Sequence, residues 1–208
     1  MDELSAVRRA FLDTAQAARA QLALAAVTKA WHKPSARPGP RTPGIPYPPT
    51  VGTLAGLVAE QILVVPLVLA EPGLPGAEPI PLLEYYEAVR WSDPTPYEVL
   101  NLRAGPDGDL AGRTGAAIAA LRLALPAEQP DRTVHLPWGP WTLSLDDFLV
   151  SRMMELTVPA DDLAFSLGLP SPRLPAAGLD TVLRLLIRHA VRRPGPGPDP
   201  LHPAAAAS

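Results

Sequence analysis

Carboxylates and histidines are the side chains of this sequence that could hold a metal ion or move a proton, and Glu155 is the most suggestive of them. It lies in the apolar run RMMELTV (152–158), and Arg152 precedes it by three residues. Residues three apart share one face of a helix, so these two side chains can form an ion pair. Such a pair at the edge of the core is the simpler interpretation. The alternative is a carboxylate that projects into a helix bundle, as in metal-binding four-helix proteins.

The remaining titratable side chains form weaker patterns. Asp161 and Asp162 are adjacent, and they can be a solvated pair or the cap of a helix that resumes after Pro159. The sequence contains no glycine-rich phosphate loop, GxSxG motif or HExxH motif. The histidines lie too far apart for a helical metal-binding pair, and each is expected to be solvated or hydrogen-bonded. They are His32, His135, His189 and His202.

The composition is that of a soluble globular chain. It has 208 residues, of which 47% are apolar, so one domain with a buried core is expected. The absence of cysteine excludes disulfides, thiolate metal sites and a cysteine nucleophile. The net charge of -3 gives no reason to expect a nucleic-acid partner. The N-terminus does not resemble a leader, and the longest apolar stretch, 62–70, is shorter than the about 20 residues of a membrane span. A cytoplasmic protein with no membrane partner is therefore expected.

Apolar residues at spacings of three and four predict an all-α protein. The predicted helices cover 2–28, 50–70, 82–90, 108–125 and 179–193. A further helix begins at Ser144, because Asp147 three residues later completes a capping pattern, and Pro159 is expected to interrupt it. A small hairpin over 133–144 precedes that helix.

Several details of these helices can be predicted as well. The first helix is expected to be capped by Asp2 and to leave Arg8 off its apolar stripe. Pro66 is expected to kink or end the helix over 50–70. In the last helix, the residues expected to face inward are Val182, Leu183, Leu186 and Ala190.

Proline-rich segments connect these elements. Residues 34–49 hold seven prolines, and they are predicted to form a stiff surface loop, with a site for a proline-binding partner as the alternative. Residues 194–208 are predicted to be a disordered Pro/Ala tail after one domain over 1–193. The simplest architecture for the domain is an up-and-down helix bundle.

Four separated segments resemble one family in the order in which that family carries them. RMMELTVPADDLAFSLGL (152–169) resembles the signature helix of the N-terminal, metal-binding domain of mycothiol-dependent maleylpyruvate isomerase, in the DinB-like superfamily. VGTLAGLVAEQIL (51–63) resembles the second helix of that domain, WHKPS (31–35) the segment before it, and HLPWGPWTLSLDDFL (135–149) the segment before the signature helix. The resemblance implies a DinB-like up-and-down four-helix bundle with a hairpin excursion and extra short helices. It also implies a divalent metal such as zinc at one end, and mycothiol as the thiol cofactor.

The resemblance places the family's three metal ligands at positions 57, 155 and 159. Only Glu155 can ligate a metal, because Leu57 and Pro159 stand where the family has histidines. This pattern favours a degenerate member of the family that lacks bound metal and has no catalytic residues. Its retained role would be binding of a small molecule, a thiol or a partner, with Arg152 and Asp162 as possible pocket residues.

Two other functions stay open. An active thiol-dependent isomerase or transferase would need a metal site rebuilt from residues such as His32, His135, Asp161 and Asp162. A structural or dimerising bundle would need no ligand, and a homodimer is possible.

Overall fold

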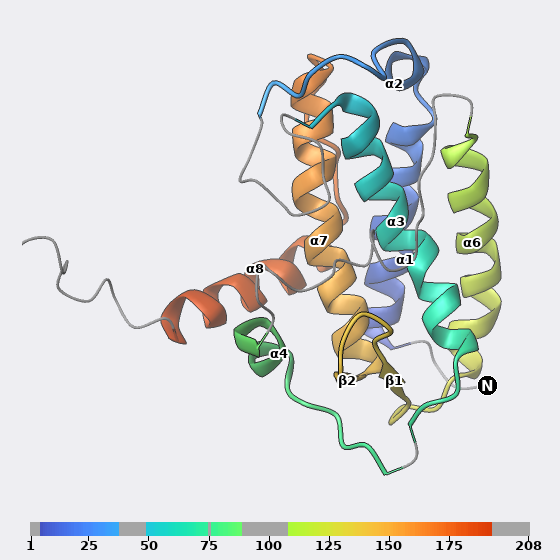
Figure 1. The fold of residues 1–208 in the computed structure, drawn as a ribbon, viewed down its shortest axis with the longest axis vertical. Helices are drawn as coiled ribbons and strands as arrows, with labels where there is room; N and C mark the ends of the chain where they lie inside the picture. Colours follow the sequence, from blue (N-terminus) through green and yellow to red (C-terminus); the bar gives the residue numbers. More distant parts are fainter. Residues whose placement is uncertain (1–4, 38–48, 75, 89–107, 193–208) are drawn as a thin grey trace, which may run out of the picture.

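The computed structural model describes residues 5–37, 49–74, 76–88 and 108–192, and these residues are mainly helical (Figure 1). The predicted all-α class is therefore confirmed in its broad form. The only sheet in the described part is an antiparallel pair, β1 (Thr133–His135) and β2 (Thr142–Ser144). The helices are α1 (Ala6–Leu22), α2 (Ala25–Lys29), α3 (Val51–Ala70), α4 (Leu82–Ala88), α6 (Leu110–Ala124), α7 (Leu145–Ser166) and α8 (Ala176–Arg192), and η1 (Leu125–Ala127) is a 3-10 turn.

The helices α1, α3, α6 and α7 pack side by side around one core (Figure 1). The hydroxyl of Ser5, just before α1, donates to Asp146 in the first turn of α7 at 3.0 Å, so α1 and α7 start at the same end. Arg19 near the end of α1 donates its Nε hydrogen to the carbonyl of Ala111 at the start of α6 (2.9 Å), so α6 runs in the opposite direction.

The helix α3 also runs opposite to α1. Its cap, Thr50, forms an isolated bridge with Pro34, which follows α2, and the amide of Gly52 donates to the carbonyl of Trp31 at 2.8 Å. The order along the chain is thus up, down, down, up, and the expected strict alternation is wrong for α3 and α6. The reason is that residues 71–109 return the chain to the end where α3 began before α6 starts.

A close contact of backbone and indole fixes the start of α3. A Cβ atom at Gly52 would lie 2.4 Å from the Trp31 ring, so only glycine allows this approach. Thr50 accepts a hydrogen bond from the amide of Thr53, which confirms the predicted helix start. The helix then continues through Pro66 to Ala70.

α3 passes a test of length and hydropathy for a membrane span, and 61% of its most apolar window is buried inside the protein. Most residues of α3 are buried, because the helix packs against α7, α6 and α1. Burial in this core is sufficient to explain why its sequence is so apolar.

The helix α7 also departs from expectation, because it continues through Pro159. Ser144 caps it by accepting from the amide of Asp147 at 3.0 Å, as predicted. It ends at Ser166, and Gly168 follows with a φ of +68°, a left-handed conformation that favours glycine. A proline inside a helix removes one backbone donor, and the carbonyl of Glu155 is the one that loses its helical partner.

The first helix begins later than predicted and buries an arginine. Ser5 caps it, and the predicted cap, Asp2, lies outside the described residues. Arg8 is only 5% exposed, so its predicted place off the buried stripe is wrong. Its guanidinium bonds Asp146 and three backbone carbonyls that follow the end of α6, namely those of Leu125, Glu128 and Gln129.

The hairpin and α6 were predicted correctly, whereas the inward face of α8 was predicted only in part. Trp138 is buried and Trp141 packs against the core from the hairpin. On α8, Val182 is buried as expected, but Leu183 and Leu186 are exposed and Leu185 is buried in their place. The cause is that α8 leaves the bundle at an angle, so only one narrow face of it touches α1 and α7 (Figure 1).

Most of the proline-rich loop (38–48) and the predicted tail lie outside the described residues.

Candidate ligand site

A cluster of polar side chains lies between the middle of α3 and the middle of α7. Glu60 and Gln61 come from α3, and Arg152 and Glu155 come from α7. Glu60 is 1% exposed, Gln61 is 6% exposed and Arg152 is 3% exposed. Charged side chains with so little solvent contact are rare in protein cores unless they are paired, so their partners decide what this cluster can do.

Arg152 has neutral partners. Its Nη1 donates to Oε1 of Gln61 at 2.7 Å, and its Nε donates to the hydroxyl of Ser151 at 3.1 Å. The guanidinium also lies 5.4 Å from the ring centre of Trp138 and 5.5 Å from that of Phe148. No carboxylate oxygen of the described residues lies within 4.0 Å of it, so the expected ion pair between Arg152 and Glu155 does not form.

Glu60 is buried without a hydrogen-bond partner. Both of its carboxylate oxygens are inaccessible, and neither contacts a donor in the structure. Burial raises the pKa of Glu60 from 4.5 to about 8, Arg152 acts to lower it, and Glu155 raises it further. At neutral pH this side chain is therefore mostly a neutral acid, because the charged form would be stranded in the core.

Glu155 differs from Glu60 because its side chain reaches solvent. Its pKa is nevertheless raised, chiefly because protein atoms crowd around the carboxylate, while Arg152 opposes the shift. Glu155 thus forms an accessible edge of the cluster, and Glu60 lies behind it in the core.

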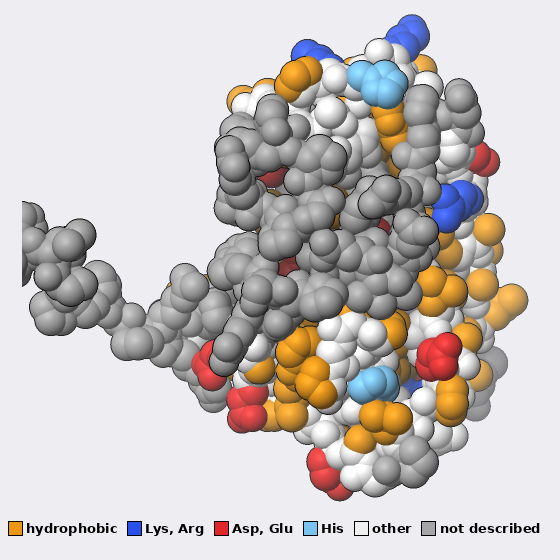
Figure 2. Space-filling view, viewed as in Figure 1, with side chains coloured by type: hydrophobic (Ala, Val, Ile, Leu, Met, Phe, Trp, Pro, Cys, Tyr) orange, Lys and Arg blue, Asp and Glu red, His pale blue; other side chains and the backbone are white. Residues whose placement is uncertain are grey.

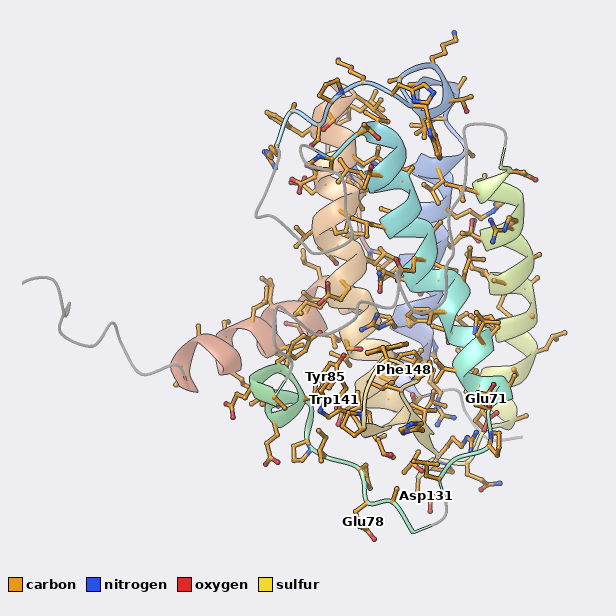
Figure 3. The ribbon with its side chains drawn as sticks, viewed as in Figure 1. Glu71, Glu78, Tyr85, Asp131, Trp141 and Phe148 are labelled. Carbon is orange, nitrogen blue, oxygen red and sulfur yellow. The ribbon has the colours of Figure 1, made fainter. Side chains whose placement is uncertain are left out.

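Aromatic side chains border the cluster on the side of α4 and the hairpin. Burial and the nearby Glu155 raise the pKa of Tyr86, on α4, well above its usual range. The indole nitrogen of Trp138 donates to the hydroxyl of Tyr85 at 3.2 Å. Tyr85 also meets Trp141 edge to face, with ring centres 5.6 Å apart, and Phe148 lies close by (Figure 3). These rings form an apolar, polarisable wall next to the charged groups.

The residues proposed for the site from the sequence lie on α3 and α7. Arg152 and Glu155 share one face of α7, as predicted. Leu57 and Pro159 are half-buried and offer no ligand atom to a metal. Among the residues that the structure describes, no three His, Asp or Glu side chains gather closely enough to hold a metal ion.

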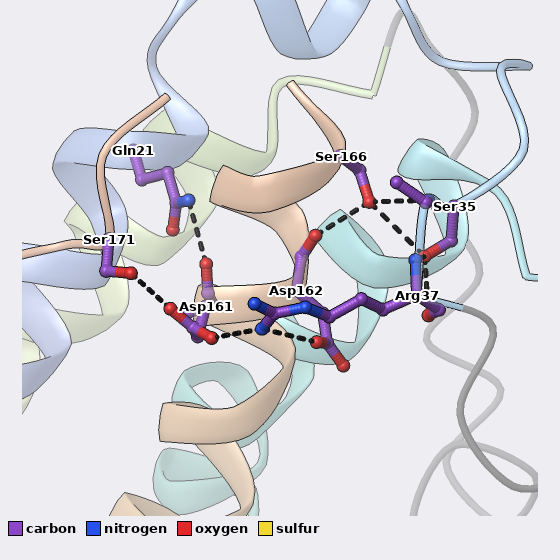
Figure 4. Close-up of polar contacts among 9 residues, drawn as sticks. Gln21, Ser35, Arg37, Asp161, Asp162, Ser166 and Ser171 are labelled. Atoms are coloured by element: carbon purple, nitrogen blue, oxygen red, sulfur yellow. Dashed lines mark hydrogen bonds and ion pairs between the residues drawn. The ribbon is translucent and has the colours of Figure 1, made fainter. Parts of the chain in front are cut away.

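Asp162 lies elsewhere, in a network that fastens residues 31–37 to the end of α7 (Figure 4). Nη1 of Arg37 donates to Asp161 at 2.7 Å and lies 3.6 Å from Asp162. A hydrogen bond from Ser171 lowers the pKa of Asp161, and Arg37 adds to this effect. Asp162 therefore takes part in a structural contact between α7 and residues 31–37.

The same network includes a buried hydroxyl. Ser166 donates to the carbonyl of Asp162 at 2.7 Å and accepts from the amide of Ala36 at 3.0 Å. The Arg37 guanidinium stacks over Phe165 at 4.0 Å from its ring centre. The bond between Ser166 and Ala36 and the stacking of Arg37 on Phe165 join residues 31–37 to the end of α7.

A separate groove of about 610 Å³ lies between α4, α8 and the first turns of α7. Its charged side chains are two aspartates, Asp147 and Asp180, and two arginines, Arg184 and Arg188. Asp180 and Arg184 pair with each other at 2.8 Å. The formal charges of these four side chains sum to zero.

Sequence reasoning missed Glu60 and Gln61, although one signal could have revealed them. Glu60 is the only charged residue in the twenty residues of α3. A single carboxylate in the middle of an otherwise apolar helix must be buried, paired or functional.

Comparison with family models, with curated proteins and with solved structures finds no match to this chain. On the described faces of the molecule, Lys and Arg side chains are scattered rather than gathered into one patch in the view of Figure 2. The functional interpretation therefore depends on the geometry of the polar cluster.

Proposed function

We propose that this protein is a metal-independent binding module for a small molecule, built on a DinB-like four-helix bundle related to the mycothiol-dependent maleylpyruvate isomerase domain. The ligand would enter beside Glu155 and contact Arg152 and the aromatic wall. Three findings support the proposal: the packing of four long helices, the position of Glu155 on α7, and the polar cluster that surrounds it.

The residues present do not fit the metal that the resemblance implies. Leu57 and Pro159 lack ligand atoms, and the accessible donor that remains is the single carboxylate of Glu155. Stable zinc sites use three or four protein ligands. The guanidinium of Arg152 also lies near the same carboxylates and would repel a divalent cation.

The observation that carries the proposal is the unpartnered carboxyl group of Glu60. A buried polar group without a partner destabilises a fold by about 1–3 kcal/mol. Burial of Arg152 against a neutral amide adds a second unfavourable arrangement, because a buried charge is normally paired with its opposite. Unsatisfied groups of this kind are concentrated at binding and catalytic sites, where a ligand completes them.

A fragment screen by NMR tests this proposal. The indole N–H signal of Trp138 and the guanidinium Nε signal of Arg152 would report binding beside Glu155. Fragments that bind at the site should shift both signals in the wild type, and Glu155→Gln should weaken the response. Glu71→Gln, on an exposed loop residue, is the matched control and should leave it unchanged. A screen in which no fragment shifts either signal would overturn the proposal.

A further inference from the structure

The helix α8 gathers exposed apolar side chains on one surface. Of the eleven large apolar side chains that are exposed in the described part of the chain, five lie on α8 and six are scattered over the rest of the fold. The five on α8 are between 41% and 79% exposed, and they are Leu179, Leu183, Leu186, Ile187 and Val191. Single exposed apolar residues are normal, whereas a contiguous group of them marks an interaction surface.

These five side chains form one stripe along the helix, which we call the α8 stripe. Leu179, Leu183 and Leu186 follow one another at spacings of four and three, and this is the spacing of a coiled-coil seam. Val182 and Leu185 are buried where α8 contacts the bundle. The α8 stripe is therefore a second apolar face, and the angle at which α8 leaves the bundle keeps it accessible (Figure 1).

Charged side chains beside the α8 stripe differ in sign between its two ends. Asp180 lies near the start of the helix, and Arg184 and Arg188 follow at intervals of four residues. Asp180 and Arg184 are exposed and pair with each other at 2.8 Å. Arg188 is exposed as well, and it forms no ion pair with any residue that the structure describes. The flank of the stripe is thus acidic at one end and basic toward the other.

We infer that α8 is a dimerisation helix, which packs antiparallel against α8 of a second copy of this chain. A two-fold interface uses the same surface of both copies, so that surface must complement itself. Antiparallel pairing meets this condition, because it brings Asp180 of each copy near Arg188 of the second copy. About the centre of the stripe, Leu183 then lies opposite Ile187 of the second copy. The inference does not depend on the proposed ligand site, since α8 contributes no residue to the polar cluster.

A membrane surface fits the α8 stripe less well. Helices that lie on membranes commonly carry tryptophan or phenylalanine on the apolar face and basic residues on the polar face. The α8 stripe contains only leucine, isoleucine and valine, and the acidic Asp180 lies beside it. The net charge of -3 also opposes binding to an anionic surface. A second copy supplies both a matching apolar stripe and complementary charges.

Sedimentation equilibrium of the full chain over a wide range of concentrations tests the inference. We expect a reversible equilibrium between monomer and dimer. Leu183→Glu should raise the dissociation constant of the dimer at least about tenfold, because it places a carboxylate in the centre of the apolar contact. Leu123→Glu is the matched control, since Leu123 is 81% exposed on α6, and it should leave the dissociation constant unchanged.

A charge exchange tests the antiparallel direction. Arg188→Glu should weaken the dimer, because the new carboxylate would face Asp180 of the second copy. Asp180→Arg combined with Arg188→Glu should restore the dimer, because each copy again offers opposite charges to the other. No weakening by the single change, or no recovery in the double variant, would contradict the antiparallel pairing. Circular dichroism checks that these variants fold, as is expected of substitutions at exposed positions.

The remaining outcomes also decide the inference. A monomer at all concentrations would overturn it, and so would a dimer that Leu183→Glu leaves unchanged. If the monomer instead binds vesicles of anionic phospholipid and Leu183→Glu abolishes this binding, the α8 stripe belongs to a membrane surface and the inference is overturned. None of these results bears on the proposed ligand site, which is tested through the signals of Trp138 and Arg152.

Discussion

Arg152 on α7 donates a hydrogen bond to Gln61 on α3 at 2.7 Å, and not to either of the two carboxylates beside it. This contact ties the two helices together at the level of the candidate site. The positive charge acts on both Glu60 and Glu155 but forms an ion pair with neither. The arrangement holds a cationic group fixed in the protein near the place where the resemblance puts a metal ion.

Replacement of Arg152 by Met should remove this tie. We expect the free energy of unfolding to decrease by about 1–3 kcal/mol, because Gln61 loses a buried hydrogen-bond partner. The pKa of Glu60 should increase further, since Arg152 acts to lower it. Urea denaturation at pH 6 and a carbon-13 carboxyl titration measure the two effects. Arg184→Met, on the exposed surface of α8, should change neither by a comparable amount.

Ionisation of Glu60 should make the free energy of unfolding depend on pH. Its pKa is higher in the folded chain, about 8, than the ordinary value of 4.5. Between these pH values the folded state binds more protons than the unfolded state. The stabilisation that comes from protonated Glu60 is therefore complete below pH 4.5 and is lost as the pH rises toward 8. The loss should approach about 1.4 kcal/mol per pH unit in the middle of this range.

Glu60→Gln should remove that part of the pH dependence. Thermal or urea unfolding of the wild type and the variant across this range gives the difference directly, and Glu71→Gln is the matched control. Parallel curves for the wild type and Glu60→Gln would show that Glu60 is not buried as described.

The network at the end of α7 should be structural and independent of the ligand site. Ser166→Ala removes the acceptor of the Ala36 amide, so hydrogen exchange at Ala36 should accelerate, with a loss of about 1 kcal/mol in stability. Asp162→Asn should leave the fragment-induced shifts of the Trp138 and Arg152 signals unchanged. A weaker response in that variant would place Asp162 in the ligand site.

Arg8 should be among the most sensitive positions outside the candidate site. Its guanidinium makes four hydrogen bonds, to Asp146 and to carbonyls at the end of α6. Arg8→Met should therefore destabilise the chain by about 2–4 kcal/mol, because several buried acceptors lose their partner. Arg122→Met, exposed on α6, should change stability by less than about 0.5 kcal/mol in the same urea titration.

Helix starts could be predicted well, because their signals are local. Thr50 and Ser144 cap helices through their own side chains, and both caps can be predicted from the residue types alone. The effect of Pro159 was misjudged for the opposite reason. One lost backbone hydrogen bond is outweighed by the packing of the rest of α7 against α1 and α3, and that packing is not visible in a local pattern.

The candidate site was only half predictable. Arg152 and Glu155 follow from spacing on one helix, whereas Gln61 and Glu60 reach them from a helix about ninety residues earlier. Arg8 shows the same limit, because its partners lie far away in the sequence. Pairings across the bundle depend on the order and direction of the helices, and that order differs from simple alternation.

Restoring the two histidines of the resembled family tests the assignment of positions 57 and 159. Leu57→His together with Pro159→His would place two imidazoles near Glu155, and His₂–carboxylate sets bind divalent metals. We expect the double variant to bind zinc measurably more tightly than the wild type in a competition titration. If it binds no more zinc than the wild type, those two positions do not face a common point and the resemblance loses its structural basis.

The most direct test of the central claim is the metal content of the wild-type protein. The chain would be purified without a histidine tag from cells grown with added zinc, nickel and manganese, and analysed by elemental mass spectrometry. The account predicts well under one equivalent of any of these metals per chain, because Glu155 lacks companion ligands and Arg152 occupies its surroundings. Close to one equivalent of a single metal that survives dialysis would contradict it.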